Sequence, residues 1–225
     1  MKISKFLLLV FTIIPTTAAI SDNRMSVEAI SSAISWVKPS LAQNKITSYA
    51  RAISKAAHQY KVDPLTLVAI AHQESSFREN LPMGKAGELG LLQIRRQWIQ
   101  NGRFRKEFKN VQEQDLKNPE KAFTYAAWIL FDLKKSSRSK KLPYWTFYNA
   151  RKFENRLKYF LRVKRHLTAI DTKRERSKAI TVAVKASTSP EPVVQRAISE
   201  MLPRDYLNQI NWYQKAVDVI REQES

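Results

Sequence analysis

Cysteine is absent from this chain, which excludes disulfide bonds and lipid attachment through a thiol. Glycine is scarce, with four residues in 225, and turn dipeptides of the Asn-Gly and Asp-Gly type are nearly absent, so β-hairpins are difficult to build. Apolar residues nevertheless make up 44% of the chain, and ten Phe, eight Tyr and five Trp exclude a disordered protein. This composition predicts a mainly helical protein that is held together by its hydrophobic core.

The first nineteen residues have the order of a secretory leader. Lys2 and Lys5 precede the apolar run Phe6–Ile14, and small residues follow as far as Ala19. This run is nine residues long, whereas a membrane-spanning helix needs roughly 20, and no later run is apolar over such a length. We therefore expect an exported protein, periplasmic or secreted, that loses residues 1–19 as a signal peptide and keeps no transmembrane anchor.

The formal net charge is +19, and much of it lies between residues 134 and 178, where there are sixteen Lys or Arg and three acids. Such a region can bind nucleic acid, an anionic membrane surface or an anionic wall polymer. A solvated helix face is the plainer interpretation of a charged run, but this local excess is too large for that alone. Export and the lack of a groove-reading motif argue against nucleic acid. We expect region 134–178 to bind anionic envelope polymers.

Helices are predicted where apolar residues recur at spacings of three and four, as they do over residues 27–37 and 46–60. Two further helices are predicted to start at Asp63-Pro64 and Asn118-Pro119, since a capping side chain there precedes a proline that fits the first turn.

Towards the C-terminus, residues 187–192 form a Ser/Thr/Pro stretch that predicts a linker or loop, and residues 207–220 predict a last amphipathic helix. Residues 180–184 (ITVAV) are the only strand candidate, and one strand has nothing to pair with. The predicted fold class is therefore all-α.

The first candidate for chemistry is Glu74, in the stretch HQESSFRENLPMGKAGELGLLQI over residues 72–94. It is predicted to lie at the C-terminal end of the helix begun at Asp63, where the helix dipole disfavours an ionised carboxylate. Desolvation by Phe77, Leu81 and Leu91 acts in the same direction. A lone glutamate at a helix end is usually an ordinary exposed residue. With a raised pKa, however, Glu74 would donate a proton near neutral pH.

Three of the four glycines, Gly84, Gly87 and Gly90, follow Glu74 at a spacing of three. Glycine permits tight turns and lets a ligand approach the backbone closely. Gln93 comes next, and its amide both donates to and accepts from a sugar hydroxyl or an acetamide. Together these residues predict a chain that folds back beside the carboxyl group of Glu74.

The order of these motifs resembles the lytic transglycosylase family with the SLT domain, a relative of goose-type lysozyme. The family pattern is Glu-Ser, a glycine turn ending in Gly-Leu-Met-Gln, a helix that carries a tyrosine, and then Tyr-Asn. This chain has Glu74-Ser75, GLLQ at residues 90–93, Tyr125 in AFTYAA and Tyr148-Asn149 in WTFYNA. Order and rough spacing match over about residues 45–167 and imply a lysozyme-like helical domain.

The resemblance implies cleavage of the β-1,4 bond between N-acetylmuramic acid and N-acetylglucosamine in peptidoglycan, with formation of 1,6-anhydromuramic acid ends. Glu74 is the implied catalytic acid and then base, and no cofactor or metal is implied. The histidines are scattered along the chain and show no metal-ligand spacing. The implied substrate-binding residues are Ser75, Gln93, Tyr125, Tyr148 and Asn149. The implied structural turn consists of Gly84, Gly87 and Gly90.

The chain departs from the family pattern at three places. Leu92 replaces the usual methionine, and Gly84 stands where a serine is common. Arg151 and Lys152 follow Tyr-Asn-Ala where a glycine is usual. The last departure affects the expected shape of the groove beyond Asn149.

Two other functions are open. A hydrolytic, lysozyme-like muramidase needs a second carboxylate, for which Glu79 and Glu88 are the candidates, although we expect Glu88 to point into solvent. A non-catalytic basic cell-wall-binding protein is the alternative from another class, and the complete motif set argues against it.

The pattern divides the chain into four parts. These are a signal peptide (1–19), an N-terminal helical segment (20–44), an SLT-like catalytic domain (45–170) and a basic linker with a helical C-terminal extension (171–225).

Overall fold

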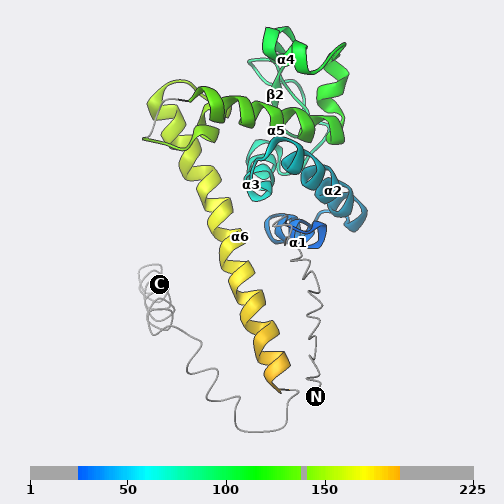
Figure 1. Cartoon of the computed structure of the whole chain (residues 1–225), viewed down its shortest axis with the longest axis vertical. Helices are drawn as coiled ribbons and strands as arrows, with labels where there is room; N and C mark the ends of the chain where they lie inside the picture. Colours follow the sequence, from blue (N-terminus) through cyan, green and yellow to red (C-terminus); the bar gives the residue numbers. More distant parts are fainter. Residues whose placement is uncertain (1–24, 138–140, 188–225) are drawn as a thin grey trace, which may run out of the picture.

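The computed structural model describes residues 25–137 and 141–187 (Figure 1). The predicted signal peptide, the stretch beyond Ser187 and the helix predicted over 207–220 lie outside the described residues. In chain order the elements are α1 (Val27–Val37), α2 (Gln43–Tyr60), α3 (Pro64–Ser75), β1 (Glu88–Leu89), β2 (Ile94–Arg95), the 3-10 helix η1 (Arg96–Gln100), α4 (Gly102–Glu107), the 3-10 helix η2 (Glu113–Lys117), α5 (Pro119–Ser136), the 3-10 helix η3 (Tyr144–Tyr148) and α6 (Phe153–Ser187).

Both helix starts predicted from a capping residue and a proline are confirmed. The Asp63 carboxylate accepts hydrogen bonds from the backbone amides of Leu65 (3.3 Å) and Thr66 (2.9 Å), and Pro64 is the first residue of α3. The Asn118 side chain likewise caps α5. These contacts satisfy amides that have no partner inside the helix, so the helix begins at these residues.

The all-α, lysozyme-like fold class is confirmed, with one small sheet added. β1 and β2 pair antiparallel, with Glu88 opposite Arg95 and Leu89 opposite Ile94. Residues 180–184, for which a strand was considered and rejected because it had no partner, belong to α6. The two strands that do form, β1 and β2, were not predicted from the sequence. Apolar β-branched residues favour a strand only where a neighbouring strand can pair with them, and here an existing helix continues through them.

The core is a single cluster to which every long helix contributes. α2 packs against α5 and α1, while α6 packs against α3 and α1 (Figure 1). On α6 the fully buried residues are Tyr159, Val163 and Ile170, spaced four and seven apart, so one face of this helix lies on the domain. The rest of α6 runs past the domain as a projecting helix (Figure 1).

The predicted domain limits at 44 and 170 do not coincide with breaks in the described structure. α1 contributes Ile30 and Ile34 to the same core as α2 and α3, and α6 continues through residue 170 as one helix. The division into segments stays a prediction.

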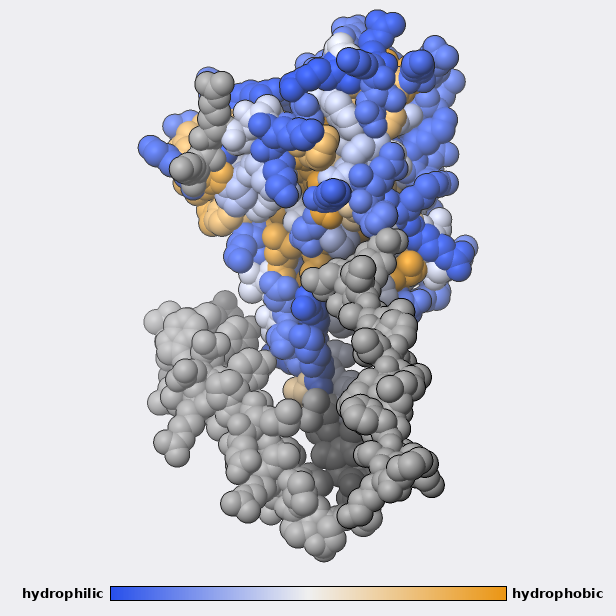
Figure 2. All heavy atoms as spheres, viewed as in Figure 1, coloured by the Kyte–Doolittle hydropathy of each residue, from blue (hydrophilic) through white to orange (hydrophobic). Residues whose placement is uncertain are grey.

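The face of the molecule shown in Figure 2 is mainly hydrophilic, with smaller apolar areas between the polar side chains. Within residues 25–137 and 141–187 no helix combines the length and apolar character that crossing a bilayer demands.

Candidate active site

Glu74 lies in the last turn of α3, as the sequence predicts. The helix ends because Ser76 and Phe77 take left-handed backbone conformations, with φ of 51° and 61°. The Ser76 amide donates to the carbonyl of His72 (2.8 Å), which closes the helix end. The Glu74 side chain therefore lies at the C-terminal end of α3, beside the glycine-rich segment that follows it in the chain.

The glycine-rich segment forms a small hairpin. Gly87 and Gly90 have positive φ (78° and 68°), which glycine adopts without steric cost. At Gly90 a Cβ atom would also meet the backbone carbonyl oxygen of Leu116, so this position needs glycine on two grounds. Gly84 has no such φ, but its amide donates to the Glu88 carbonyl (2.9 Å) and a Cβ there would meet the Glu88 carboxylate.

The hairpin closes one side of a polar cavity of about 150 Å³. Three separate segments form this cavity, namely the end of α3, the hairpin and the end of η3. Its lining residues are Glu74, Glu88, Gln93, Arg95, Tyr148 and Asn149. The structure therefore brings together Glu74, Gln93, Tyr148 and Asn149 from the set implied by the family pattern.

The carboxyl group of Glu74 is held by a tyrosine. Tyr159 on α6 donates a hydrogen bond of 2.7 Å to Oε1 of Glu74. Burial raises the pKa of Glu74 to about 7, although the Tyr159 hydrogen bond and the positive charge of Arg162 oppose this rise. The negative charge of Glu88 raises the pKa further, and Arg95 lowers it. A carboxyl group in this state is suited to giving and taking a proton near neutral pH.

The other cavity residues are fixed by contacts to backbone. Tyr148 donates from its hydroxyl to the carbonyl of Leu92 (2.9 Å), so it ties η3 to the hairpin. Burial, with the nearby charge of Glu74, holds the pKa of Tyr148 well above its usual range. Gln93 donates from its amide to the Gly90 carbonyl (2.9 Å), and Arg95 donates to the Asn149 carbonyl (2.9 Å). The polar groups that face the cavity are therefore held in place by the backbone.

Ser75 and Tyr125 do not line this cavity. Ser75 is buried, and its hydroxyl donates to the Ala71 carbonyl (3.2 Å) within α3. Tyr125 packs with ring centroids 5.3 Å from Phe104 and 4.8 Å from Phe108. Their roles in substrate binding stay predictions from the family pattern.

Glu88 was expected to point into solvent, and this expectation is wrong. Its carboxylate lines the cavity, pairs with Arg95 (3.4 Å) and accepts from the Ala86 amide (2.9 Å). The reason is the register of the hairpin, since residues directly opposite each other on paired strands project to the same face. Gly90, which directly follows β1 and opens the turn to β2, was the sequence signal for such a hairpin.

Sequence reasoning also missed Arg95, Tyr159 and Arg162. Arg95 lies two residues beyond Gln93, the spacing at which strand side chains share a face. Tyr159 and Arg162 are three residues apart on α6, so they lie on one side of that helix. Nothing in the local sequence shows that this side meets Glu74, because the packing of α6 on α3 decides it.

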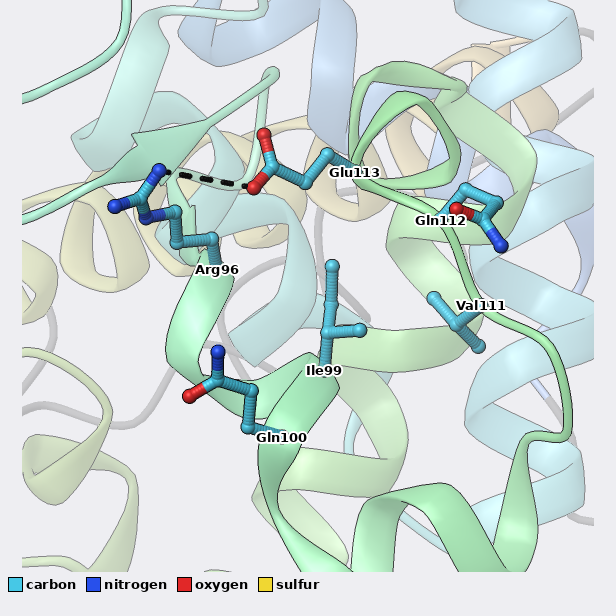
Figure 3. Close-up of a pocket in the computed structure, with 6 residues that line it drawn as sticks. All are labelled: Arg96, Ile99, Gln100, Val111, Gln112 and Glu113. Carbon is cyan, nitrogen blue, oxygen red and sulfur yellow. Dashed lines mark ion pairs between the residues drawn. The ribbon is translucent and has the colours of Figure 1, made fainter.

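A second cavity lies beyond β2 and has a different character (Figure 3). It measures about 310 Å³, and its only carboxylate, Glu113, pairs with Arg96 at 3.7 Å. Arg95, the last residue of β2, lines the Glu74 cavity, whereas Arg96, the first residue of η1, lines this one. Without a carboxyl group held as Glu74 is, this cavity is not a second candidate for acid–base chemistry. Its lining residues are Arg96, Ile99, Gln100, Val111, Gln112 and Glu113.

The histidines are less scattered in space than they are in the sequence. His72 and His166 lie with ring centroids 4.3 Å apart, and their nearest ring nitrogens are 3.2 Å apart. Burial lowers the pKa of both residues, that of His166 to about 4. In the part of the chain that the structure describes, no three or more His, Cys, Asp or Glu side chains gather to hold a metal ion.

Comparison with protein families agrees with this geometry. The family model described as the transglycosylase SLT domain matches residues 51–160, a range that contains every residue of the Glu74 cavity and also Tyr159. Searches of curated proteins and of solved structures found no match. The matched range contains the Glu-Ser, glycine-turn and Tyr-Asn motifs together. The SLT domain is the domain of transglycosylase-type enzymes that act on peptidoglycan. Residues 51–160 of this chain are a transglycosylase SLT domain.

Proposed function

We propose that this protein is a lytic transglycosylase that cleaves the β-1,4 bond between N-acetylmuramic acid and N-acetylglucosamine and leaves 1,6-anhydromuramic acid ends. The observation that carries this proposal is the buried, hydrogen-bonded carboxyl group of Glu74 in an SLT domain. Its carboxyl group accepts a hydrogen bond from Tyr159 and opens into a polar cavity, and burial raises its pKa to about 7. Such a group is partly protonated near neutral pH and can act first as an acid and then as a base.

In the first step Glu74 donates its proton to the glycosidic oxygen. The bond between that oxygen and C1 of the muramyl residue breaks, and the other sugar leaves as an alcohol. Glu74 is now ionised, and the same groups that oppose the rise of its pKa stabilise the new charge. These are the Tyr159 hydroxyl and the cations Arg162 and Arg95.

In the second step the Glu74 carboxylate accepts the proton of the muramyl C6 hydroxyl. The C6 oxygen forms a bond to C1 and closes the 1,6-anhydro ring, which returns Glu74 to its protonated form. No water is consumed, because the nucleophile belongs to the substrate. Intramolecular attack of this kind has a large entropic advantage, which allows one carboxyl group to serve both steps.

Gln93 and Asn149 are the proposed sugar contacts, since both line the cavity beside Glu74 and an amide both donates and accepts. Tyr148 lies near the reacting centre and keeps the hairpin at its place through the Leu92 carbonyl. The proposed reaction needs no cofactor.

Hydrolysis is the second candidate function. From the sequence, Glu88 was expected to point into solvent, whereas its observed position in the cavity supports a hydrolase. Glu88 lines the same cavity as Glu74, as the second carboxylate of a hydrolase would. It is, however, already engaged by Arg95 and by the Ala86 amide. A carboxylate held in an ion pair and a hydrogen bond is a weaker base towards water.

The products separate the two candidates. Purified peptidoglycan is digested with the protein, and the soluble fragments are analysed by mass spectrometry. Transglycosylation gives muramyl ends that are one water lighter than hydrolytic ends and that resist borohydride reduction. Reducible muramyl ends alone would instead identify a muramidase.

We also propose that the protein acts outside the cytoplasm, in the periplasm or after secretion, where peptidoglycan is found. The leader-like residues 1–19 support this, together with the substrate class of the SLT domain. Anionic envelope polymers are proposed partners of the basic region 134–178.

A further inference from the structure

A further cavity, distinct from the one beyond β2, adjoins the Glu74 cavity, and basic residues surround it. It has a volume of about 400 Å³ and shares Arg95 and Asn149 with the Glu74 cavity, so a group bound at Glu74 can extend directly into it. Its lining residues are Arg95, Asn149, Ala150, Arg151, Lys152, Asn155, Lys158 and Arg162.

Five of these residues are cations and none is an acid. They converge from β2, from the connection between η3 and α6, and from the first three turns of α6. Lys158 and Arg162 are four apart on one face of that helix. A solvated helix face does not explain a cavity that three segments build together.

Four of these five cations form no ion pair within the described residues, while Arg95 pairs with Glu88. Among the ion pairs of residues 25–137 and 141–187, none involves Arg151, Lys152, Lys158 or Arg162. Cations gathered around one cavity repel each other, and a bound anion removes that repulsion. The first turn of α6, which supplies Asn155, adds the positive end of the helix dipole at the same place.

We propose that this basic cavity is a subsite for the carboxylates carried by the muramyl residue that Glu74 attacks. The inference rests on the proposed function, because it places a peptidoglycan strand at Glu74. On such a strand the lactyl ether and its peptide stem branch from the muramyl ring next to the scissile bond, and their acids lie within reach of the adjoining cavity. Arginine binds a carboxylate through two parallel N–H donors, and lysine adds a point charge.

The proposal also accounts for a departure in the sequence. Arg151 and Lys152 stand where the family pattern has glycine after Tyr-Asn-Ala, and both line this cavity. A glycine in place of Arg151 would remove a positive charge from the part of this cavity next to Asn149. The change makes this protein selective for strands that keep their acidic substituents.

Binding to three short strand fragments tests the proposal. The first carries its peptide stems, the second has lost the stems and keeps only lactyl carboxylates, and the third is a neutral chitin fragment of equal length. Binding is measured by calorimetry with the full-length mature chain carrying Glu74→Gln, so that no fragment is cut. Into this background the pair Arg151→Gln and Lys152→Gln is introduced.

Loss of two partly exposed charged contacts should raise Kd for the stem-bearing fragment about tenfold. Kd for the chitin fragment should stay unchanged. If the stripped fragment is weakened as much as the stem-bearing one, the lactyl carboxylate is the ligand. If it is unaffected, the ligand is a carboxylate of the stem. Both results support the subsite. Equal weakening of all three fragments, or of none, overturns it.

The matched control is the pair Arg105→Gln and Lys106→Gln, which removes one arginine and one lysine from exposed positions of α4, outside the cavity and outside region 134–178. This pair should change none of the three affinities. If it weakens the stem-bearing fragment as strongly as the cavity pair does, general charge attraction explains the binding and the subsite is overturned. Thermal unfolding of all variants confirms that these exposed substitutions leave the fold intact.

The test keeps the subsite apart from the reaction. Anhydro products from the parent protein, with equal binding by the cavity pair, would retain the proposed function and remove the subsite. Charge-selective binding by a parent that releases no fragments would do the reverse.

Discussion

Tyr159 and Glu74, 85 residues apart in the chain, are joined by a hydrogen bond of 2.7 Å from the tyrosine hydroxyl to the carboxyl group. The bond exists because α6 packs along α3 and places a fully buried ring over the end of that helix. Burial raises the pKa of Glu74, and the hydrogen bond from Tyr159 lowers it, so the pKa of this carboxyl group is about 7 instead of higher. The bond therefore sets the balance between the acid and base roles of Glu74.

Tyr159→Phe should lower kcat/KM about tenfold, as expected for one hydrogen bond to a charged group. The bond favours the ionised form, so its loss raises the pKa of Glu74, and the alkaline limb of the pH profile of kcat/KM should move to higher pH. Tyr60→Phe is the matched control, because it removes a tyrosine–carboxylate bond to Glu107 elsewhere in the fold. A control profile that moves equally would show that the effect is not local to Glu74.

Glu74→Gln should abolish fragment release, with a loss of about 10⁴-fold or more, since one residue supplies both proton transfers. Affinity for glycan fragments should persist, because the amide can still accept from Tyr159 and the other cavity groups are unchanged. Glu79→Gln is the control, because Glu79 pairs with Lys45 and does not line the cavity. A folded Glu74→Gln protein with near-parent activity would end the assignment of Glu74.

The same variant should change how stability depends on pH. The folded-state pKa of Glu74 is raised from 4.5 to about 7, so between these values the unfolded chain releases the proton while the folded protein keeps it. The contribution of Glu74 to the unfolding free energy of the parent therefore falls across this window, by about 3 kcal/mol in total, and stays low above it. Glu74→Gln removes this loss.

Urea unfolding of both proteins below and above this window measures the effect. Relative to the parent, the variant should gain stability on going from about pH 4 to about pH 8. A difference in unfolding free energy that does not change with pH would show that Glu74 has an ordinary pKa in the folded protein.

Glu88→Gln distinguishes a neighbouring charge from a second catalytic carboxylate. The negative charge of Glu88 raises the pKa of Glu74, so its removal should move the alkaline limb of kcat/KM to lower pH while anhydro products continue to form. Glu113→Gln, which breaks the ion pair with Arg96 outside this cavity, should leave the profile unchanged. A loss at Glu88 as large as that at Glu74, measured on the same substrate, would support the hydrolytic mechanism.

Gly90→Ala should destabilise the protein by about 2 kcal/mol, because alanine is strained at positive φ and its Cβ would meet the Leu116 carbonyl. Fragment release should fall as well, since the hairpin that carries Gln93 would have to shift. Gly102→Ala has no atom within 4 Å of the new Cβ and lies at the start of α4, so stability there should hold or rise slightly. Equal midpoints of thermal unfolding for the two variants would contradict this account of the hairpin.

Much of the frame of the site follows from short-range rules that can be applied to the sequence. The Asp63 cap and the proline after it fix where α3 begins, and Glu74 falls in its last turn because the helix ends at Ser75. Gly90 permits the turn between β1 and β2 that brings Gln93 beside Glu74. These features depend on residues only a few positions apart, which is why they could be predicted.

Other features depend on how distant segments pack. The direction of Glu88 follows from its strand register with Arg95, and the contact between His72 and His166 follows from the packing of α3 on α6. The placement of Tyr159 over Glu74 and of Arg162 beside the basic cavity has the same origin. The sequence alone determined where the main helices of the domain begin and which carboxyl group lies at a helix end. The tertiary structure decided which side chains surround that group, because burial in a shared core, rather than local backbone preference, fixes the angle and register at which helices meet.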